Sequence, residues 1–258
     1  MPTIFVQPIL RTTIETWWRD FAPITMLGLL ILTGTELVIH LMGVSGSMDP
    51  STATLIQTAR AAAFALFVSA VSAGTMLRLA GMTRRPGTYM LASLKLAQPG
   101  LLTALTLAAL VFGLLIVDLL LGAVIGGMSR VVILPAILFM LACLLPAIPV
   151  SIEERLPPLS ALRRAAGMTK THRGPILGLL LLVFAILLLP AMLVFAVVYG
   201  PVALTAEGSE DLAATLPALS ITRPGFWIVE LSSLMFNGLI AVVPPTVYLA
   251  LRAAERTG

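Results

Sequence analysis

Charged side chains are scarce in this chain. Asp, Glu, Lys and Arg together make up 11% of its 258 residues, while 59% of the residues are hydrophobic. Soluble domains carry about 25% charged residues, so the deficit indicates a protein of the lipid bilayer. Apolar spans take up more than half of the chain, which leaves no room for a soluble catalytic domain.

Cysteine and histidine are almost absent. The single cysteine, Cys143, excludes an intramolecular disulfide and a cysteine-based metal site. The two histidines, His40 and His172, stand near segments that are predicted to lie on opposite sides of the membrane. The sequence has no His-Glu-x-x-His, no glycine-rich phosphate loop and no Cys/His cluster. It therefore predicts no metal, no cofactor and no enzyme of a motif-defined class.

Six apolar runs are each long enough to cross the ~30 Å hydrocarbon core of a bilayer, which takes about 20 helical residues. They cover residues 24–43, 55–80, 100–123, 130–150, 175–199 and 225–251. The sequence therefore predicts an all-α, polytopic membrane protein in which residues 1–258 form a single integral membrane domain.

Positive charge is concentrated on one side of the predicted membrane. Of the 16 basic residues, 13 fall in the N-terminal segment, in the connections at 78–98 and 151–174, or in the C-terminal tail, whereas the opposite connections hold two bases against four acids. Under the positive-inside rule this distribution places both termini in the cytoplasm. It predicts a multi-pass protein of the cell inner (plasma) membrane. Because the charge follows the topology, the net charge of +4 indicates anionic lipid as a partner and not nucleic acid.

The three cytoplasmic segments share a plan. Each begins at a proline and ends at a proline that opens the next span: Pro8 to Pro23, Pro86 to Pro99, and Pro158 to Pro175. Proline is tolerated in the first turn of a helix and disfavoured in its interior. We therefore expect a short interfacial helix, a break and a new transmembrane helix in each segment. Spans one, three and five start at nearly equal intervals, which predicts three modules of an interfacial helix plus a hairpin.

The first interfacial helix, over residues 8–21, has the clearest pattern. An apolar stripe at helical spacing is opposed by charges; the stripe consists of Leu10, Ile14, Trp17 and Phe21, and the charges are Arg11, Glu15 and Arg19. Such a helix lies in the plane of the membrane, with its tryptophan at the level of the headgroups. The segments 87–98 and 159–170 are predicted as the second and third interfacial helices.

Two stretches resemble a known membrane family. The first is "ERLPPLSALRRAAGMTKTHRGPILGLLLL", with matching residues Glu154, Ala161, Leu162, Arg163, Arg164, Thr169, Lys170 and Arg173; the second is the tail "VYLALRAAERTG", with Tyr248, Leu251 and Arg252. They resemble the six-helix family named after the membrane domain of glycerophosphoryl diester phosphodiesterase. Ala165 and Ala166 replace the usual Ser-Trp of that family. The resemblance implies a small bacterial membrane module without the catalytic barrel, for which this chain has no room.

Two arrangements that resemble catalytic sites are better explained structurally. Glu153 and Glu154 are adjacent, so on a helix their carboxylates point about 100° apart, and we interpret them as solvated acids at a helix start. "GVSG" at 43–46 has the Gly-x-Ser-Gly form of rhomboid proteases, whose mechanism needs a histidine base at the serine. His172 is predicted on the other side of the membrane and His40 precedes the serine on the same helix end. A turn at the helix exit explains the two glycines.

Ionisable groups inside the spans are the remaining functional signal. They form a candidate polar cluster toward the outer ends of their spans, which consists of Glu36, His40, Arg60, Asp118 and Glu230. Such residues are rare in lipid and often functional, although snorkelling or pairing that sets helix register also explains them. Glu36 and Arg60 stand seven and five positions from the outer ends of their spans. At ~1.5 Å per residue their depths differ by roughly 3 Å, which predicts an ion pair for which Asp118 or Glu230 would compete.

These observations leave two functions open. The first is a non-enzymatic inner-membrane module that organises lipid or a membrane-protein partner at the cytoplasmic interface. Its candidate contacts with anionic headgroups are Arg84, Arg85, Arg163, Arg164, Lys170 and Arg173. The second is a small secondary transporter, or a lipid- or ion-binding protein, that uses the polar cluster. A transporter requires an outward-open aqueous cavity that reaches these side chains, whereas a scaffold would bury or pair them.

The charge bias makes a topological prediction. Reporters fused after Gly258 or inserted within 160–170 should be active as cytoplasmic fusions, and a reporter within 205–212 should read as external. Enzyme reporters that function on only one side of the membrane measure this directly. A cytoplasmic signal from 205–212 would contradict the six-span arrangement.

Overall fold

Helices form all of the regular structure in the described part of the chain. The computed structural model describes residues 6–43, 49–81, 86–205 and 224–257. The elements are α1 (Val6–Arg19), α2 (Phe21–Gly28), a π-helical segment η1 (Leu29–Thr33), α3 (Gly34–Leu41), α4 (Pro50–Leu79), α5 (Pro86–Ile125), α6 (Met128–Leu144), α7 (Ala147–Glu153), α8 (Pro158–Thr169), α9 (Arg173–Thr205) and α11 (Pro224–Thr257). The predicted all-α class is confirmed.

Six of the described helical stretches are long and apolar enough to cross a membrane. They are Phe21–Leu41, Ser51–Leu79, Pro86–Ala123, Met128–Glu153, Arg173–Val198 and Pro224–Arg256. Each overlaps one of the six runs predicted from hydropathy. The first stretch is built from α2, η1 and α3 in succession, so it is a single span whose middle has π-helical hydrogen bonding.

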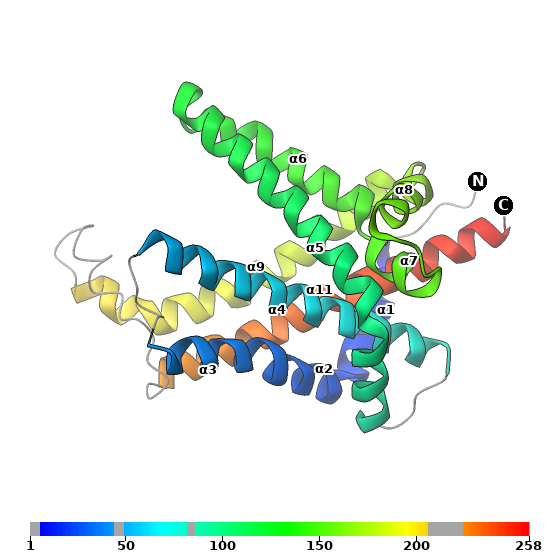
Figure 1. Cartoon of the computed structure of the whole chain (residues 1–258), viewed down its shortest axis with the longest axis horizontal. Coiled ribbons are helices and arrows are strands. Elements are labelled where there is room, and N and C mark those ends of the chain that lie inside the picture. The colour runs from blue at the N-terminus through cyan, green and yellow to red at the C-terminus, as the bar shows by residue number, and fades with distance from the viewer. Residues whose placement is uncertain (1–5, 44–48, 82–85, 206–223, 258) are drawn as a thin grey trace.

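The molecule has a compact end and a divided end. Both termini lie at the compact end together with α7 and α8, and we call it the terminal end (Figure 1). Away from it, the α5–α6 hairpin leans away from α4, α9 and α11 (Figure 1). In the most apolar windows of α5 and α9, 6% of the residues are buried. These two helices therefore present most of their circumference to lipid over much of their length.

Helix α1 is the predicted first interfacial helix, and its buried face differs from its predicted apolar stripe. The face that packs on the bundle carries Ile9, Thr13 and Thr16, and the Thr13 hydroxyl lies 2.8 Å from that of Thr246 on α11. The predicted apolar stripe stays partly exposed; its Ile14, for example, is 40% exposed. The stripe is therefore divided: Leu10 and Trp17 pack partly against the core, while the buried contact is made by Ile9 together with the two threonines.

The predicted break at Pro99 is wrong. Helix α5 is 40 residues long and runs through Pro99 without a break. It bends between its first and second parts (Figure 1). Proline removes one backbone hydrogen bond, to the carbonyl of residue 95. Lys95 is exposed. The cost of the proline is therefore met by a bend, and the expected interfacial helix at 87–98 is the first part of α5.

The chain folds back on itself between α6 and α8. Helix α6 ends at Leu144, and Pro146 precedes α7. Arg155, between α7 and α8, has a left-handed backbone with φ of 51°, which is uncommon for a residue other than glycine. The Thr169 hydroxyl then donates a hydrogen bond of 2.8 Å to the Cys143 carbonyl. Helix α8, the predicted interfacial helix at 159–170, is thereby held against the last turn of α6.

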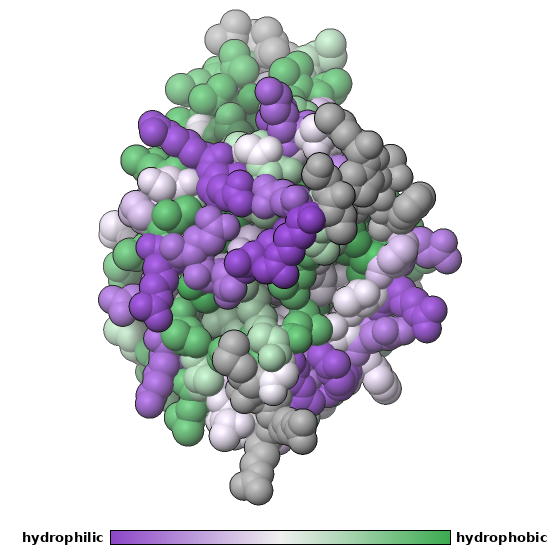
Figure 2. All heavy atoms as spheres, turned by 90° about the vertical axis from the view of Figure 1, so that its right-hand side faces the viewer, coloured by the Kyte–Doolittle hydropathy of each residue, from purple (hydrophilic) through white to green (hydrophobic). Residues whose placement is uncertain are grey.

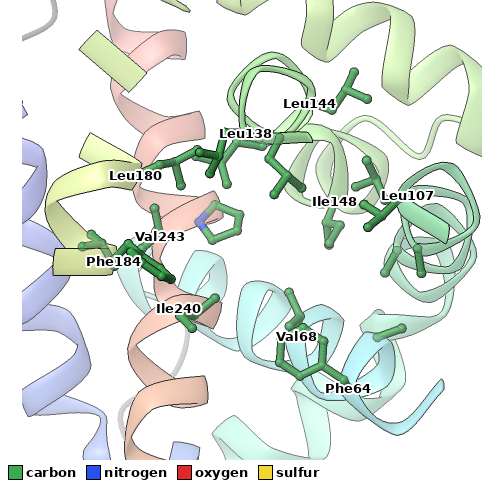
Figure 3. A pocket seen from close by; sticks show the side chains of 18 of the residues that line it. Phe64, Val68, Leu107, Leu138, Leu144, Ile148, Leu180, Phe184, Ile240 and Val243 are labelled. Carbon is green, nitrogen blue, oxygen red and sulfur yellow. The ribbon is translucent and has the colours of Figure 1, made fainter. Parts of the chain in front are cut away.

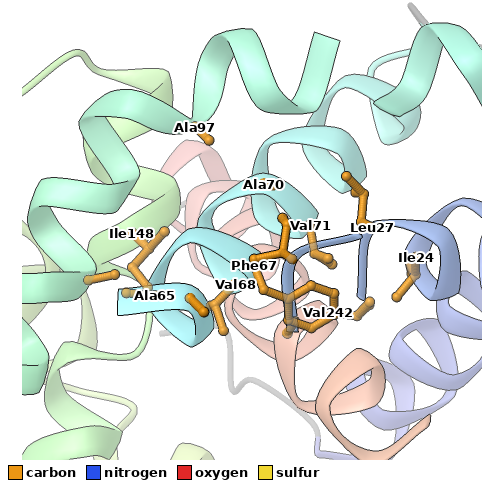
Figure 4. Close-up of a cluster of buried hydrophobic side chains, with 14 of the residues drawn as sticks. Ile24, Leu27, Ala65, Phe67, Val68, Ala70, Val71, Ala97, Ile148 and Val242 are labelled. Atoms are coloured by element: carbon orange, nitrogen blue, oxygen red, sulfur yellow. The ribbon is translucent and has the colours of Figure 1, made fainter. Parts of the chain in front are cut away.

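The core is centred on α4. Its side chains Phe67, Ala70 and Val71 are fully buried against α2, α5, α7 and α11 (Figure 4). Nearer the terminal end, Tyr89 of α5 is also fully buried and packs over Gly74 of α4. Helices in lipid associate through close packing of small residues, because lipid tails supply no hydrophobic driving force between them.

The contact at Gly74 makes a prediction about stability. A Cβ at this position would overlap the Tyr89 ring and the Ser93 hydroxyl, both fully buried. We expect Gly74→Ala to lower the free energy of unfolding by about 1–3 kcal/mol. The matched control is Gly178→Ala on α9, where an added Cβ meets no atom within 4 Å. Equal unfolding curves for the two variants in detergent would contradict the close contact.

Candidate functional site

The predicted ion pair between the first two spans is present. The Arg60 guanidinium on α4 donates from Nε to Glu36 Oε1 at 2.6 Å and from Nη2 to Glu36 Oε2 at 2.8 Å. This two-bond geometry is the strongest form of an arginine–carboxylate contact. The Glu36 side chain is 20% exposed and that of Arg60 is 41% exposed. The pair therefore joins α3 to α4 at a depth where an uncompensated charge is costly.

Glu230 brings a third helix to this pair. Its carboxylate on α11 accepts a hydrogen bond of 2.7 Å from the Thr33 hydroxyl, and its charge also acts on Arg60. Thr33 ends the π-helical segment η1. Such segments are rare and recur at functional sites. Here η1 carries the threonine that binds Glu230, and it directly precedes the helix that carries Glu36.

The other two members of the predicted polar cluster behave differently. The ring of His40 lies with Nδ1 2.9 Å from the Glu36 backbone carbonyl and packs edge-on against Phe226. Asp118 lies on α5, in the hairpin that leans away from α3 and α4 (Figure 1). Among the described residues, no hydrogen bond or ion pair joins Asp118 to Glu36, Arg60 or Glu230. The structure does not bring Asp118 to the cluster. The prediction failed here because hydropathy gives the depth of a residue and not the tilt of its helix.

Glu153 and Glu154 belong to an ion-pair network at the terminal end. Arg252 of α11 lies 2.7 Å from Glu153, and Arg164 of α8 lies 3.5 Å from Glu154 and 2.8 Å from Glu255. The acids that we expected to be solvated at a helix start therefore connect the α7–α8 turn to the last helix. Burial lowers the pKa of the Arg164 guanidinium, but the hydrogen bond and charge of Glu255 and the charge of Glu154 outweigh it and raise that pKa above its ordinary value.

The predicted headgroup contacts divide into engaged and available cations. Arg164 is engaged by the two glutamates of the network. Arg163 and Lys170 are exposed, in a region of the terminal end where hydrophilic side chains gather (Figure 2). Arg173 lies over the Phe139 ring at 5.6 Å, and its buried Nε has no hydrogen-bond partner. Arg84 and Arg85 lie outside the described residues.

An apolar crevice occupies the space between the leaning hairpin and the rest of the bundle. Its volume is about 410 Å³, and the residues that line it are all Ala, Val, Leu, Ile, Phe or Pro. Side chains from α4, α5, α6, α7, α9 and α11 surround a central space (Figure 3). Small-molecule sites of about 300–1,000 Å³ usually carry a few polar groups that orient the ligand. This crevice offers no polar side chain, so it suits a hydrocarbon chain.

The sequence analysis did not identify the crevice, although a signal for it exists. Two alanines on α4, Ala61 and Ala65, face two on α5, Ala104 and Ala108, across the crevice. Residues four apart lie on the same face of a helix. Pairs of small residues at this spacing usually mark faces where helices approach closely, and such a face leaves room for another occupant where the neighbouring helix diverges.

Comparison of the chain with protein-family models, curated proteins and solved structures gives no match. The resemblance to the phosphodiesterase membrane-domain family therefore stays a prediction. The residues that carried it nevertheless meet in space, since the Tyr248 hydroxyl donates a hydrogen bond of 3.5 Å to Glu154.

The ion pair in the membrane predicts non-additive mutations. Glu36→Gln and Arg60→Gln should each destabilise the protein, because each single change leaves one charge uncompensated. The double variant should lose less stability than the sum of the two single losses. We expect a coupling free energy of about 1–3 kcal/mol in a double-mutant cycle. The exposed pair Arg11–Glu15, with side chains 80% and 62% exposed, is the control and should show no measurable coupling, because water screens both charges. Additive losses at Glu36 and Arg60 would show that the pair contributes no coupling.

Proposed function

We propose that this protein is a non-enzymatic integral membrane module that binds lipid by holding a hydrocarbon chain in the apolar crevice. The observation that carries the proposal is the crevice itself, a partly open space of about 410 Å³ lined by purely apolar side chains. An apolar cavity of this kind stays dry in proteins, and empty space forfeits the dispersion energy of its walls. In a bilayer the molecules at hand to fill it are lipid chains.

The surroundings of the crevice support a role at one membrane interface. Its terminal end is closed by α7, which contributes Ile148 to the lining, and beyond it lies the hydrophilic end of the molecule (Figure 2). The predicted orientation makes this end cytoplasmic. An inner membrane of a bacterial cell is part of the proposal on the strength of the sequence resemblance. A module that holds a lipid here would organise lipid, or a partner that recognises the lipid, on the cytoplasmic side.

The contacts of the acidic residues favour binding over catalysis. Glu153 and Glu154, the nearest approach to an acid–base pair in the sequence, each have an arginine partner. Both carboxylates are held in ion pairs, to Arg252 of α11 and to Arg164 of α8, which favours a structural role for them. The proposal therefore assigns both residues to holding the terminal end together.

Secondary transport through the polar cluster is the alternative function, and it is less well supported. Glu36 and Arg60 neutralise each other through two hydrogen bonds, and Glu230 has the Thr33 hydroxyl as a partner. The walls of the crevice include none of these residues. Paired charges away from the crevice are the arrangement expected when they set the register of three helices.

Adjacent alanines on α5 provide the test. Ala108 lines the crevice, whereas Ala109 is exposed on the outside of the same helix. In vesicles that contain a phospholipid with a photoreactive group in its acyl chain, Ala108→Trp should reduce cross-linking to Phe64 and Phe184 severalfold, because the indole occupies the chain's space. Ala109→Trp should leave this cross-linking unchanged.

The comparison is valid when both variants keep the thermal unfolding midpoint of the wild type in detergent. Cross-linking to outward-facing residues of α5 and α9 serves as the internal standard, since annular lipid reaches these residues in every variant. Equal labelling of Phe64 and Phe184 in the two tryptophan variants would refute the proposal.

A further inference from the structure

We infer that the lipid held in the crevice is an anionic phospholipid whose phosphate is bound by Arg173, with Lys170 as a second cation. The inference rests on the proposed function and adds to it the headgroup class and the membrane leaflet. It places the headgroup at the terminal end of the seam between α6 and α9, with one acyl chain along that seam in the crevice.

The contacts of Arg173 leave its charge uncompensated. Its guanidinium lies 5.6 Å above the ring of Phe139 on α6, and its Nε is buried without a hydrogen-bond partner. An aromatic face holds a guanidinium in place, while the N–H groups at its edge point away from the ring. A phosphate group is the acceptor that best matches such an edge, because it takes two parallel N–H bonds at once.

The other charged residues of the terminal end explain why Arg173 is set apart. Each described acid at this end has an arginine partner: Glu15 with Arg11, Asp20 with Arg78, Glu153 with Arg252, and Glu154 and Glu255 with Arg164. No hydrogen bond or ion pair in the described chain connects a carboxylate to Arg173. An ammonium-bearing headgroup would thus find no acid left over, whereas an anionic headgroup finds cations.

The position of Arg173 matches the length of a lipid chain. Leu180 and Phe184 of α9 line the crevice and follow Arg173 by about 10 Å and 16 Å along the helix axis at ~1.5 Å per residue. One leaflet contributes roughly half of the ~30 Å hydrocarbon core. On α6, Phe139 lies beside Leu138, which also lines the crevice. A lipid with its phosphate on Arg173 therefore reaches Phe184 with the end of its chain.

Lys170 adds a second positive charge to the same place. It is exposed on the turn between α8 and α9, where the His172 amide donates a hydrogen bond of 2.9 Å to the Thr169 carbonyl. Basic residues near a membrane surface attract anionic lipid. Arg173 contributes a stacked, oriented guanidinium, and Lys170 contributes charge without a fixed direction.

The experiment uses the full-length protein in vesicles with equal amounts of phosphatidylglycerol and phosphatidylcholine, both carrying the photoreactive chain. We expect the wild type to show about fivefold more phosphatidylglycerol than phosphatidylcholine among the adducts at Phe184, the ratio that corresponds to about 1 kcal/mol per basic residue. Arg173→Gln should lower this ratio severalfold without abolishing the adducts, and Lys170 accounts for any preference that remains. Arg173→Lys, which keeps the charge but loses the fork, should give an intermediate ratio.

Arg130→Gln is the matched control, because it removes the same charge from an exposed arginine in the first turn of α6, at the opposite end of the molecule. It should keep the wild-type ratio. A phosphatidylglycerol preference that survives Arg173→Gln, or that Arg130→Gln removes equally, would overturn the headgroup assignment. Failure of the proposed function has a different signature, namely adducts at Phe184 that do not respond to Ala108→Trp. Arg173→Lys keeps the test decisive if the glutamine variant folds poorly.

Discussion

The close approach of α5 to α4 is the constraint on which the other features of this protein depend. Gly74 allows the ring of Tyr89 to lie against the α4 backbone. About three turns further along α5, Gly100 approaches Ser69 of α4 and Ile152 of α7. Beyond these contacts the facing residues are alanines that line the crevice. A helix pair that touches closely at one end and carries no interlocking side chains at the other can diverge, and the divergence of the hairpin leaves the crevice open to lipid (Figure 1).

Charge has different tasks at the two ends of the bundle. Toward the divided end, Glu36, Arg60 and Glu230 come from three helices. The cost of bringing these charges into lipid is offset by the Glu36–Arg60 pair and by the hydrogen bond from Thr33 to Glu230. At the terminal end, every described acid is paired and several cations are left over. The first arrangement sets helix positions, whereas the second leaves a cationic surface, to which our proposal assigns the binding of anionic headgroups.

The proposed lipid site arises where these two properties meet. Helices α6 and α9 line part of the crevice and also join Phe139 to Arg173 at its terminal end. One wall thus combines a surface for a hydrocarbon chain with a cation for a phosphate. Neither feature alone selects a ligand, because apolar helix faces and surface arginines are common in membrane proteins. Their separation along α9 by roughly the thickness of one leaflet favours a phospholipid.

Length, hydropathy and helical period determined the six spans, the interfacial helices α1 and α8, and the common depth of Glu36 and Arg60, because each of these is a property of a single segment. The bend at Pro99, the exclusion of Asp118 from the cluster, the pairing of Glu154 with Arg164 and the crevice were decided only by the tertiary structure. A lipid-facing leucine and a helix-facing leucine have the same hydropathy, so composition does not report which faces meet. The tilt of the α5–α6 hairpin depends on contacts such as that of Gly74 with Tyr89, between spans whose mutual orientation no local pattern encodes.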